Sequence, residues 1–202
     1  MPQISKKIVI SQIVLIFILP VALLYFNVVS SDWRVFLLAL CSLFIYGIIR
    51  HEKWTHEDMG LNNNFKKYLL PYIIFTIVSV GLIFFIDSKI GFESIRHKPV
   101  LLEKLLLFLP ISFFQEFAFR AFLIHRLKLI SKSNLTIIGI NVILFTLIHV
   151  IYPSLNVILP VTFIGGIFFA WLYIKYPNFL LISLSHSAVN ITAVLLGFFG
   201  TN

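Results

Sequence analysis

The strongest constraint on the fold of this chain is a series of apolar runs, most of them long enough to cross a lipid bilayer as helices. A helix needs about 17 to 25 predominantly apolar residues to span the hydrocarbon layer. Charged or turn-forming residues separate seven such runs along the sequence. They are residues 8–29, 35–49, 68–86, 105–124, 135–151, 157–174 and 179–199.

The composition leads to the same class of protein. Of the 202 residues, 59% are hydrophobic and only 12% are charged, too few charges for the surface of a soluble domain of this length. We therefore predict an all-α integral membrane protein, a bundle of about seven transmembrane helices around a polar cavity, forming one membrane domain over residues 1–202. Pro20 and Asn27 interrupt the first run where a signal peptide needs a compact apolar core, so we expect a retained helix.

Lysine and arginine residues predict the orientation, because short cytoplasmic loops carry the excess of them. With the N-terminus in the cytoplasm and the C-terminus outside, the larger set lies on the cytoplasmic side. That set is Lys6, Lys7, Arg50, Lys53, Lys66, Lys67, Arg126, Lys128, Lys132 and Lys175, against Arg34, Lys89, Arg96, Lys98 and Lys104 on the other side.

Several functional classes are excluded or weakened. Cys41 is the single cysteine, which excludes a disulfide framework and a cysteine-based metal site. The chain has no glycine-rich phosphate loop, and no internal repeat supports a solute carrier. The net charge of +8 requires no nucleic-acid partner, because anionic lipids explain it. The polar stretch 50–67 fits either a surface-lying segment or a solvated loop.

The fourth apolar run contains polar residues that a membrane-spanning helix does not need, and they form the first motif. Glu116 is the only acid within the seven runs, and Arg120 follows it at the spacing of one helical turn. The two can form an ion pair, which lowers the cost of placing each in lipid. Gln115 is rotated by about 100° from Glu116 and should face another sector of the bundle. A structural ion pair is the simpler interpretation, and direct chemistry is the alternative.

Two further patterns have the same spacing. Phe145 and His149 would share a face of the fifth helix, and His186 and Asn190 a face of the seventh. Two imidazoles and an amide that converge could handle protons and a developing negative charge. A hydrogen bond to a nearby carbonyl or hydroxyl is the alternative for each histidine alone.

In these motifs the chain resembles the CAAX protease and bacteriocin-processing (CPBP/Abi) family of intramembrane endopeptidases. The family's motifs read Glu-Glu-x-x-x-Arg, Phe-x-x-x-His and His-x-x-x-Asn, in that order. Residues 113–127, FFQEFAFRAFLIHRL, resemble the first motif, and residues 163–190 resemble the glycine-rich sixth helix and the third motif. The resemblance covers the core, residues 105–190.

The resemblance implies hydrolysis of a peptide bond in a membrane-associated protein or peptide, by a water molecule held between helices. It implies that His149 helps to activate the water, and that His186 and Asn190 stabilise the oxyanion. Glu116 and Arg120 would form a structural pair, with Phe145 packed beside the second-motif histidine.

Gln115 departs from the family pattern, because it replaces the catalytic first Glu. An amide does not accept a proton at neutral pH, and loss of a general base costs about a hundredfold to ten-thousandfold in rate. Activity would then need Glu116 as base, His149 acting alone, or Gln115 positioning the water. The alternative is a catalytically silent member, a membrane scaffold, regulator or immunity protein.

A divalent metal such as zinc is a further alternative, with Glu116, His149 and His186 as ligands. The sequence lacks a His-Glu-x-x-His helix, and Asn190 is a poor zinc ligand, so we expect a metal-free site. Helical rise places His149 at a different depth from Glu116 and His186 on these boundaries. Either the fourth helix continues past Ile124 and the fifth begins after Leu135, or the helices cross steeply.

Overall fold

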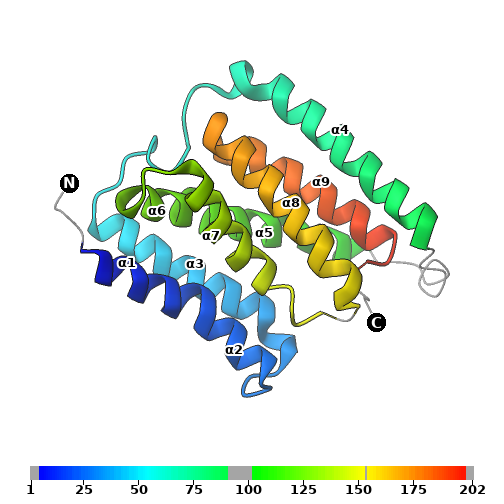
Figure 1. Ribbon diagram of the computed structural model, residues 1–202, viewed down its shortest axis with the longest axis horizontal. Coiled ribbons are helices and arrows are strands. Elements are labelled where there is room, and N and C mark those ends of the chain that lie inside the picture. The colour runs from blue at the N-terminus through cyan, green and yellow to red at the C-terminus, as the bar shows by residue number, and fades with distance from the viewer. Residues whose placement is uncertain (1–4, 91–101, 153, 199–202) are drawn as a thin grey trace.

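The computed structural model describes residues 5–90, 102–152 and 154–198, which contain only helices and the turns between them (Figure 1). The prediction of an all-α membrane protein is confirmed. The helices are α1 (Lys6–Ile13), η1 (Val14–Ile18), α2 (Leu19–Tyr25), η2 (Ser31–Trp33), α3 (Arg34–His51), α4 (Phe65–Ile90), α5 (Leu102–Glu116), η3 (Phe117–Leu123), α6 (Ile124–Ile130), α7 (Asn134–Leu147), α8 (Leu155–Lys175) and α9 (Phe179–Leu195).

Within the described ranges, five helical stretches are long and apolar enough to cross a membrane, and two apolar helices are shorter. The five stretches are Lys6–Tyr25, Ser31–His51, Phe65–Lys89, Leu105–Ile130 and Leu155–Lys175; the shorter helices are α7 and α9. The seven predicted runs therefore all correspond to helices, although those of the fifth and seventh runs, α7 and α9, are shorter than a membrane-spanning helix.

Several predicted boundaries were wrong by a few residues. The fourth helix continues past Ile124, through η3 and α6 to Ile130, as the first solution for the depth of the histidines required, but the fifth helix, α7, begins at Asn134 and not after Leu135. The second run is short enough to allow a start before Arg34, and this alternative is confirmed, because the span begins at Ser31. Helix α4 continues to Ile90 and includes buried Asp87, so Glu116 is not the only acid in the apolar helices. These ends were missed because a flanking charge does not stop a helix when the backbone can continue its hydrogen bonds.

Helix α7 ends earlier than predicted, and His149 lies in the turn after it. The His149 backbone N–H bonds to the Thr146 carbonyl at 3.0 Å instead of to the Phe145 carbonyl. The His149 ring takes the Phe145 carbonyl, with Nδ1 at 2.8 Å. The His149 side chain thus caps α7. It bonds to the Phe145 carbonyl, which loses its backbone N–H partner because the helix ends here.

Side-chain caps set the start of the two short helices. The Ser133 hydroxyl accepts from the Thr136 N–H at 3.3 Å at the start of α7, and the Asn178 side chain accepts from the Leu181 N–H at 3.0 Å at the start of α9. Caps of this kind stabilise a helix by about 1 kcal/mol each. They fix the register in which α7 and α9 present their polar residues.

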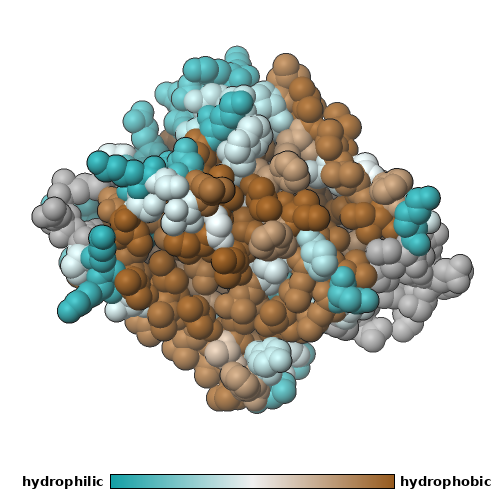
Figure 2. Space-filling model, in the orientation of Figure 1, coloured by the Kyte–Doolittle hydropathy of each residue, from teal (hydrophilic) through white to brown (hydrophobic). Residues whose placement is uncertain are grey.

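The helices pack so that α9 lies between α4 and α5, although α4 and α9 are far apart in the sequence (Figure 1). Helix α8 packs along α7, where Gly166 allows close approach: a Cβ there would lie 3.2 Å from the Phe145 ring. Helices α1, α2 and α3 lie together on one side of the bundle. The face of the molecule seen in Figure 2 is largely hydrophobic over the helices, with most hydrophilic residues toward its edges.

The polar stretch between α3 and α4 is not a fully solvated loop. Trp54 is buried, with its ring stacked on Phe122 at 5.8 Å between centroids. Gly60, at φ +72°, accepts from the Phe179 N–H at 3.0 Å and has no room for a Cβ against the Tyr173 hydroxyl. The segment therefore closes one end of the bundle.

Candidate active site

Glu116 is the centre of the polar cluster and connects two helices of the core. Its side chain is completely buried. One carboxylate oxygen, Oε2, lies 3.3 Å from Arg120 Nε, and the other, Oε1, lies 2.6 Å from His186 Nδ1. The expected pair one turn apart is present, and the same carboxylate also holds an imidazole from α9. A buried carboxylate bound on both oxygens has little freedom to reorient.

Arg120 lies in a cage of aromatic rings. Its guanidinium carbon is 4.3 Å from the centroid of the Phe145 ring and 5.6 Å from that of Phe169. A cation over ring faces is attracted by their negative charge density, which helps to offset the cost of burying the guanidinium. Phe145, expected only to pack beside a histidine, therefore also covers the cation of the first motif.

A π-helical turn, η3, carries Arg120 and widens the fourth helix. Inside this turn, the Phe119 carbonyl accepts from Asn141 Nδ2 at 2.7 Å. Asn141 is completely buried on α7. The amide thus satisfies a backbone group in the π turn, and it joins α7 to the fourth helix. π turns inside α-helices are frequent at functional sites.

His149 and His186 come together around Phe145. The Phe145 ring centroid is 5.1 Å from that of His149 and 5.7 Å from that of His186. With Nδ1 of His149 bound to the Phe145 carbonyl, the neutral ring carries its proton on Nδ1 and its lone pair on Nε2. With Nδ1 of His186 donating to Glu116, proton exchange with a ligand falls to Nε2.

A small cavity joins these groups. Phe145, His149, His186 and Asn190 all line it, and its volume is about 60 Å³. One water needs about 10 to 15 Å³ measured in this way, so the cavity accommodates a few water molecules. Asn190 Nδ2 donates to the Ser112 hydroxyl at 3.0 Å, which orients the amide and leaves its second N–H for another acceptor.

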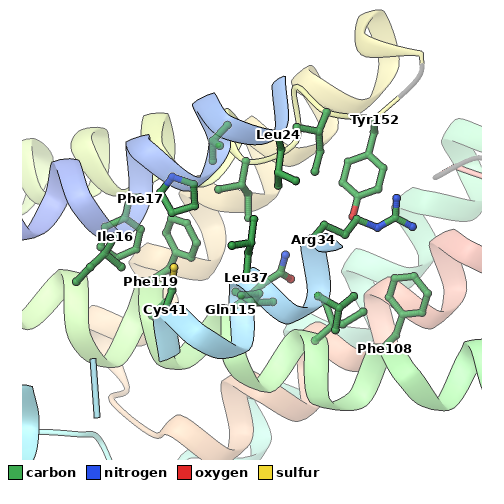
Figure 3. A pocket seen from close by; sticks show the side chains of 18 of the residues that line it. Ile16, Phe17, Leu24, Arg34, Leu37, Cys41, Phe108, Gln115, Phe119 and Tyr152 are labelled. Atoms are coloured by element: carbon green, nitrogen blue, oxygen red, sulfur yellow. The ribbon is translucent and has the colours of Figure 1, made fainter. Parts of the chain in front are cut away.

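Gln115 does not lie with the two histidines. It lines a separate cavity of about 430 Å³ between α5 and the N-terminal helices, near Leu37 and Phe119 (Figure 3). The rotation of about 100° between neighbouring helical positions explains the separation, because Glu116 then faces α9. The position at which the family carries its catalytic Glu is thus on the other side of the helix from the His149 and His186 cavity.

The three suggested metal ligands do not form a metal site. Among the described residues, no group of three or more His, Cys, Asp or Glu side chains could hold a metal ion. The reason is visible in the contacts: Glu116 uses its oxygens for Arg120 and His186, and His149 directs Nδ1 to a carbonyl.

Two residues of the cluster were missed from the sequence. Ser112 orients Asn190, and Asn141 holds the π turn. Both are polar residues inside apolar runs, which was the available signal. Their partners are distant in sequence, so no spacing rule connects them to the motifs.

Comparison with models of protein families matches residues 97–192 to one described as type II CAAX prenyl endopeptidase Rce1-like. The match includes all the motif residues of the cluster. No curated protein matches the chain, and no solved structure does.

Proposed function

Residues 97–192 belong to the Rce1-like family of type II CAAX prenyl endopeptidases, and from this premise we propose that the chain is an intramembrane endopeptidase. It hydrolyses a peptide bond in a membrane-associated protein or peptide, such as a prenylated tail, a peptide leader or a small membrane peptide. The supporting observation is that His149, His186 and Asn190 line one cavity of the size of a few water molecules. No metal takes part in this proposal.

The proposed reaction begins with the water in this cavity. His149 Nε2 accepts a proton as the water oxygen attacks the carbonyl carbon of the peptide bond. Protonated His186, through Nε2–H, and the second N–H of Asn190 donate to the oxyanion. The proton on His149 then passes to the amide nitrogen as the C–N bond breaks, which gives a carboxylic acid and an amine.

Glu116 acts through His186 in this scheme. The 2.6 Å contact between Oε1 and Nδ1 sets the ring orientation and directs Nε2 away from the carboxylate. A carboxylate that orients a catalytic imidazole is common among hydrolases that use histidine. Arg120 Nε lies 3.3 Å from the other carboxylate oxygen and balances its charge.

The proposal includes an orientation in the membrane, with the N-terminus in the cytoplasm and the C-terminus outside. The excess of lysine and arginine on the loops at the end of the bundle closed by Trp54 supports it. The lipid bilayer is then a constant partner, and substrates approach from within it or from its surface.

The test is cleavage of a mixed peptide library by the purified protein in liposomes. His149→Ala and His186→Ala should each lower cleavage by about a hundredfold or more, the usual contribution of acid–base groups. His125→Ala is the matched control, because His125 lies on α6 and does not line this cavity; its ring lies beside Trp54, with centroids 3.9 Å apart. Equal cleavage by all three variants would contradict the assignment of the site.

One observation favours a second function, a catalytically silent membrane scaffold, regulator or immunity protein. The position of the family's catalytic Glu is occupied by Gln115, which cannot serve as a base and faces the other cavity. Gln115→Glu separates the two functions. A protease that works through His149 should change its rate less than threefold or so in this variant, whereas a silent protein that acquires cleavage would establish the second function.

A further inference from the structure

The larger cavity, of about 430 Å³, lies apart from the two histidines and has the volume of a small-molecule site. Helices η1 and α2, the first half of α3, one face of α5 with the start of η3, and the segment after α7 enclose it, and most of its walls are apolar. Its inner end is formed by Phe119 and Cys41, and its outer end by Arg34 and Tyr152 (Figure 3). The shape suits an elongated apolar group with a polar head.

Gln115 is the one amide among the residues that line this cavity. Its side chain is only 7% exposed, and its Oε1 has no hydrogen-bond partner within the described residues. A buried carbonyl oxygen that accepts no hydrogen bond costs about 1 to 3 kcal/mol, so the amide is not satisfied by the protein alone. An amide has both a donor and an acceptor, so it pairs with an ester carbonyl through its NH₂ group.

The outer end carries one charge of each sign. Arg34 is exposed, with its guanidinium carbon 5.6 Å from the centroid of the Tyr152 ring. Asp32 also lines the cavity and is exposed, with Oδ2 accepting from the Ser30 hydroxyl at 3.2 Å. A phosphate matches the guanidinium, and an ammonium group matches the carboxylate.

Aromatic side chains place this end of the cavity at the level of lipid headgroups. Tyr25, Phe26, Trp33 and Phe36 are all more than half exposed around the turn between α2 and α3. Exposed aromatic residues concentrate at the boundary between headgroups and hydrocarbon. Arg34 and Asp32 therefore lie where a phospholipid carries its charges, and the apolar interior lies where it carries its chains.

We propose that this cavity binds one glycerophospholipid with an ethanolamine headgroup. The phosphate lies at Arg34 and the ammonium at Asp32, while one acyl chain extends inward toward Phe119. Gln115 donates to an ester carbonyl. The site holds α1, α2 and α3 against the core through the bound lipid, and it does not depend on the proposed proteolysis.

The experiment is photo-crosslinking in phosphatidylcholine nanodiscs that contain a trace of phosphatidylethanolamine with a diazirine at the end of one acyl chain. Mass spectrometry should locate the label on residues inside the cavity, such as Cys41 and Phe119. Arg34→Gln should lower this labelling about fivefold, the effect expected for one basic residue at a headgroup, and Arg34→Lys should retain most of it.

Lys89→Gln is the matched control, because it also removes one exposed cation, from the far end of α4. It should leave cavity labelling unchanged. Asp32→Asn should abolish the preference for the ethanolamine probe over a choline probe with the same chains. Equal loss in Arg34→Gln and Lys89→Gln, or label confined to outward-facing residues such as Leu40 and Phe44, would overturn the proposal. So would equal labelling by a phosphatidylglycerol probe.

Discussion

Two buried arginines, six positions apart on the fourth helix, are neutralised by carboxylates in different ways. Arg120 pairs with Glu116 within its own helix, and both side chains are completely buried. Arg126 pairs with Glu52 from the segment between α3 and α4, with Nη2 to Oε1 at 2.7 Å and with 18% of the Glu52 side chain exposed. Each guanidinium also lies over aromatic rings, in the second case those of Trp54 and Phe122.

The comparison shows that the burial of a charge pair determines what the pair does. The inner pair, Glu116 and Arg120, is completely buried beside His186, and its carboxylate holds the imidazole. The outer pair, Glu52 and Arg126, lies where water reaches Glu52. It holds the segment between α3 and α4 across the end of the bundle. Burial makes an ion pair costly to break, whereas partial exposure lets water replace the lost partner.

The largest expected effect is from breaking the inner pair. Glu116→Ala leaves Arg120 as a buried charge without its carboxylate, and loss of one partner of a buried pair typically costs about 3 to 5 kcal/mol. Unfolding by SDS in mixed micelles measures this. Glu52→Ala in the same assay should have a clearly smaller effect, because Glu52 is partly exposed and water can take its place beside Arg126. Equal effects of the two substitutions would show that burial does not distinguish the pairs.

An intermediate effect on stability is expected at Gly166 of α8, which packs against Phe145, the ring that covers Arg120. Gly166→Ala adds a Cβ 3.2 Å from Phe145 Cδ1, whereas Gly165→Ala, one position away, meets nothing within 4 Å. Both gain about 0.5 to 1 kcal/mol of helix propensity. Overpacking, at about 1 to 3 kcal/mol, should remove that gain in Gly166→Ala alone. Thermal unfolding in detergent compares the two, and identical stabilities would show that Phe145 moves without cost.

The smallest effect is a pH dependence confined to the outer pair. Burial raises the pKa of Glu52, but hydrogen bonds from Arg126 and Trp54 outweigh it, so the pKa of Glu52 in the folded protein is lowered from 4.5. Because the pKa is lowered in the folded protein, the ionised carboxylate stabilises the fold at pH values above its ordinary pKa of 4.5. This stabilisation is lost as the pH falls through the lowered pKa.

Glu52→Gln should therefore flatten the decrease in stability below pH 4.5. SDS unfolding measured in steps from neutral pH downward tests this, with Glu57→Gln as the control because Glu57 is an exposed acid of the same segment. An unchanged acid profile in Glu52→Gln, or the same flattening in Glu57→Gln, would show that the outer pair does not carry the effect.

The inner pair could be predicted from the sequence, whereas the outer pair could not. Glu116 and Arg120 are one turn apart, and helical geometry alone brings such residues together. Glu52 and Arg126 are far apart in the sequence, and only the closure of the segment over the bundle unites them. The same distinction applies to Asn141 and Ser112, whose partners lie on other helices.

The sequence by itself determined the membrane class, the approximate helices and the local pairs of the motifs, because apolar length and helical spacing are properties of a single segment. Only the tertiary structure decided which groups share a cavity. It placed His149 after the end of α7 and joined His186 to Glu116 across two helices. It also directed Gln115 into the separate cavity at the N-terminal helices. The physical reason is that the packing of helices, and the side chain that satisfies each buried polar atom, depend on segments distant in the chain.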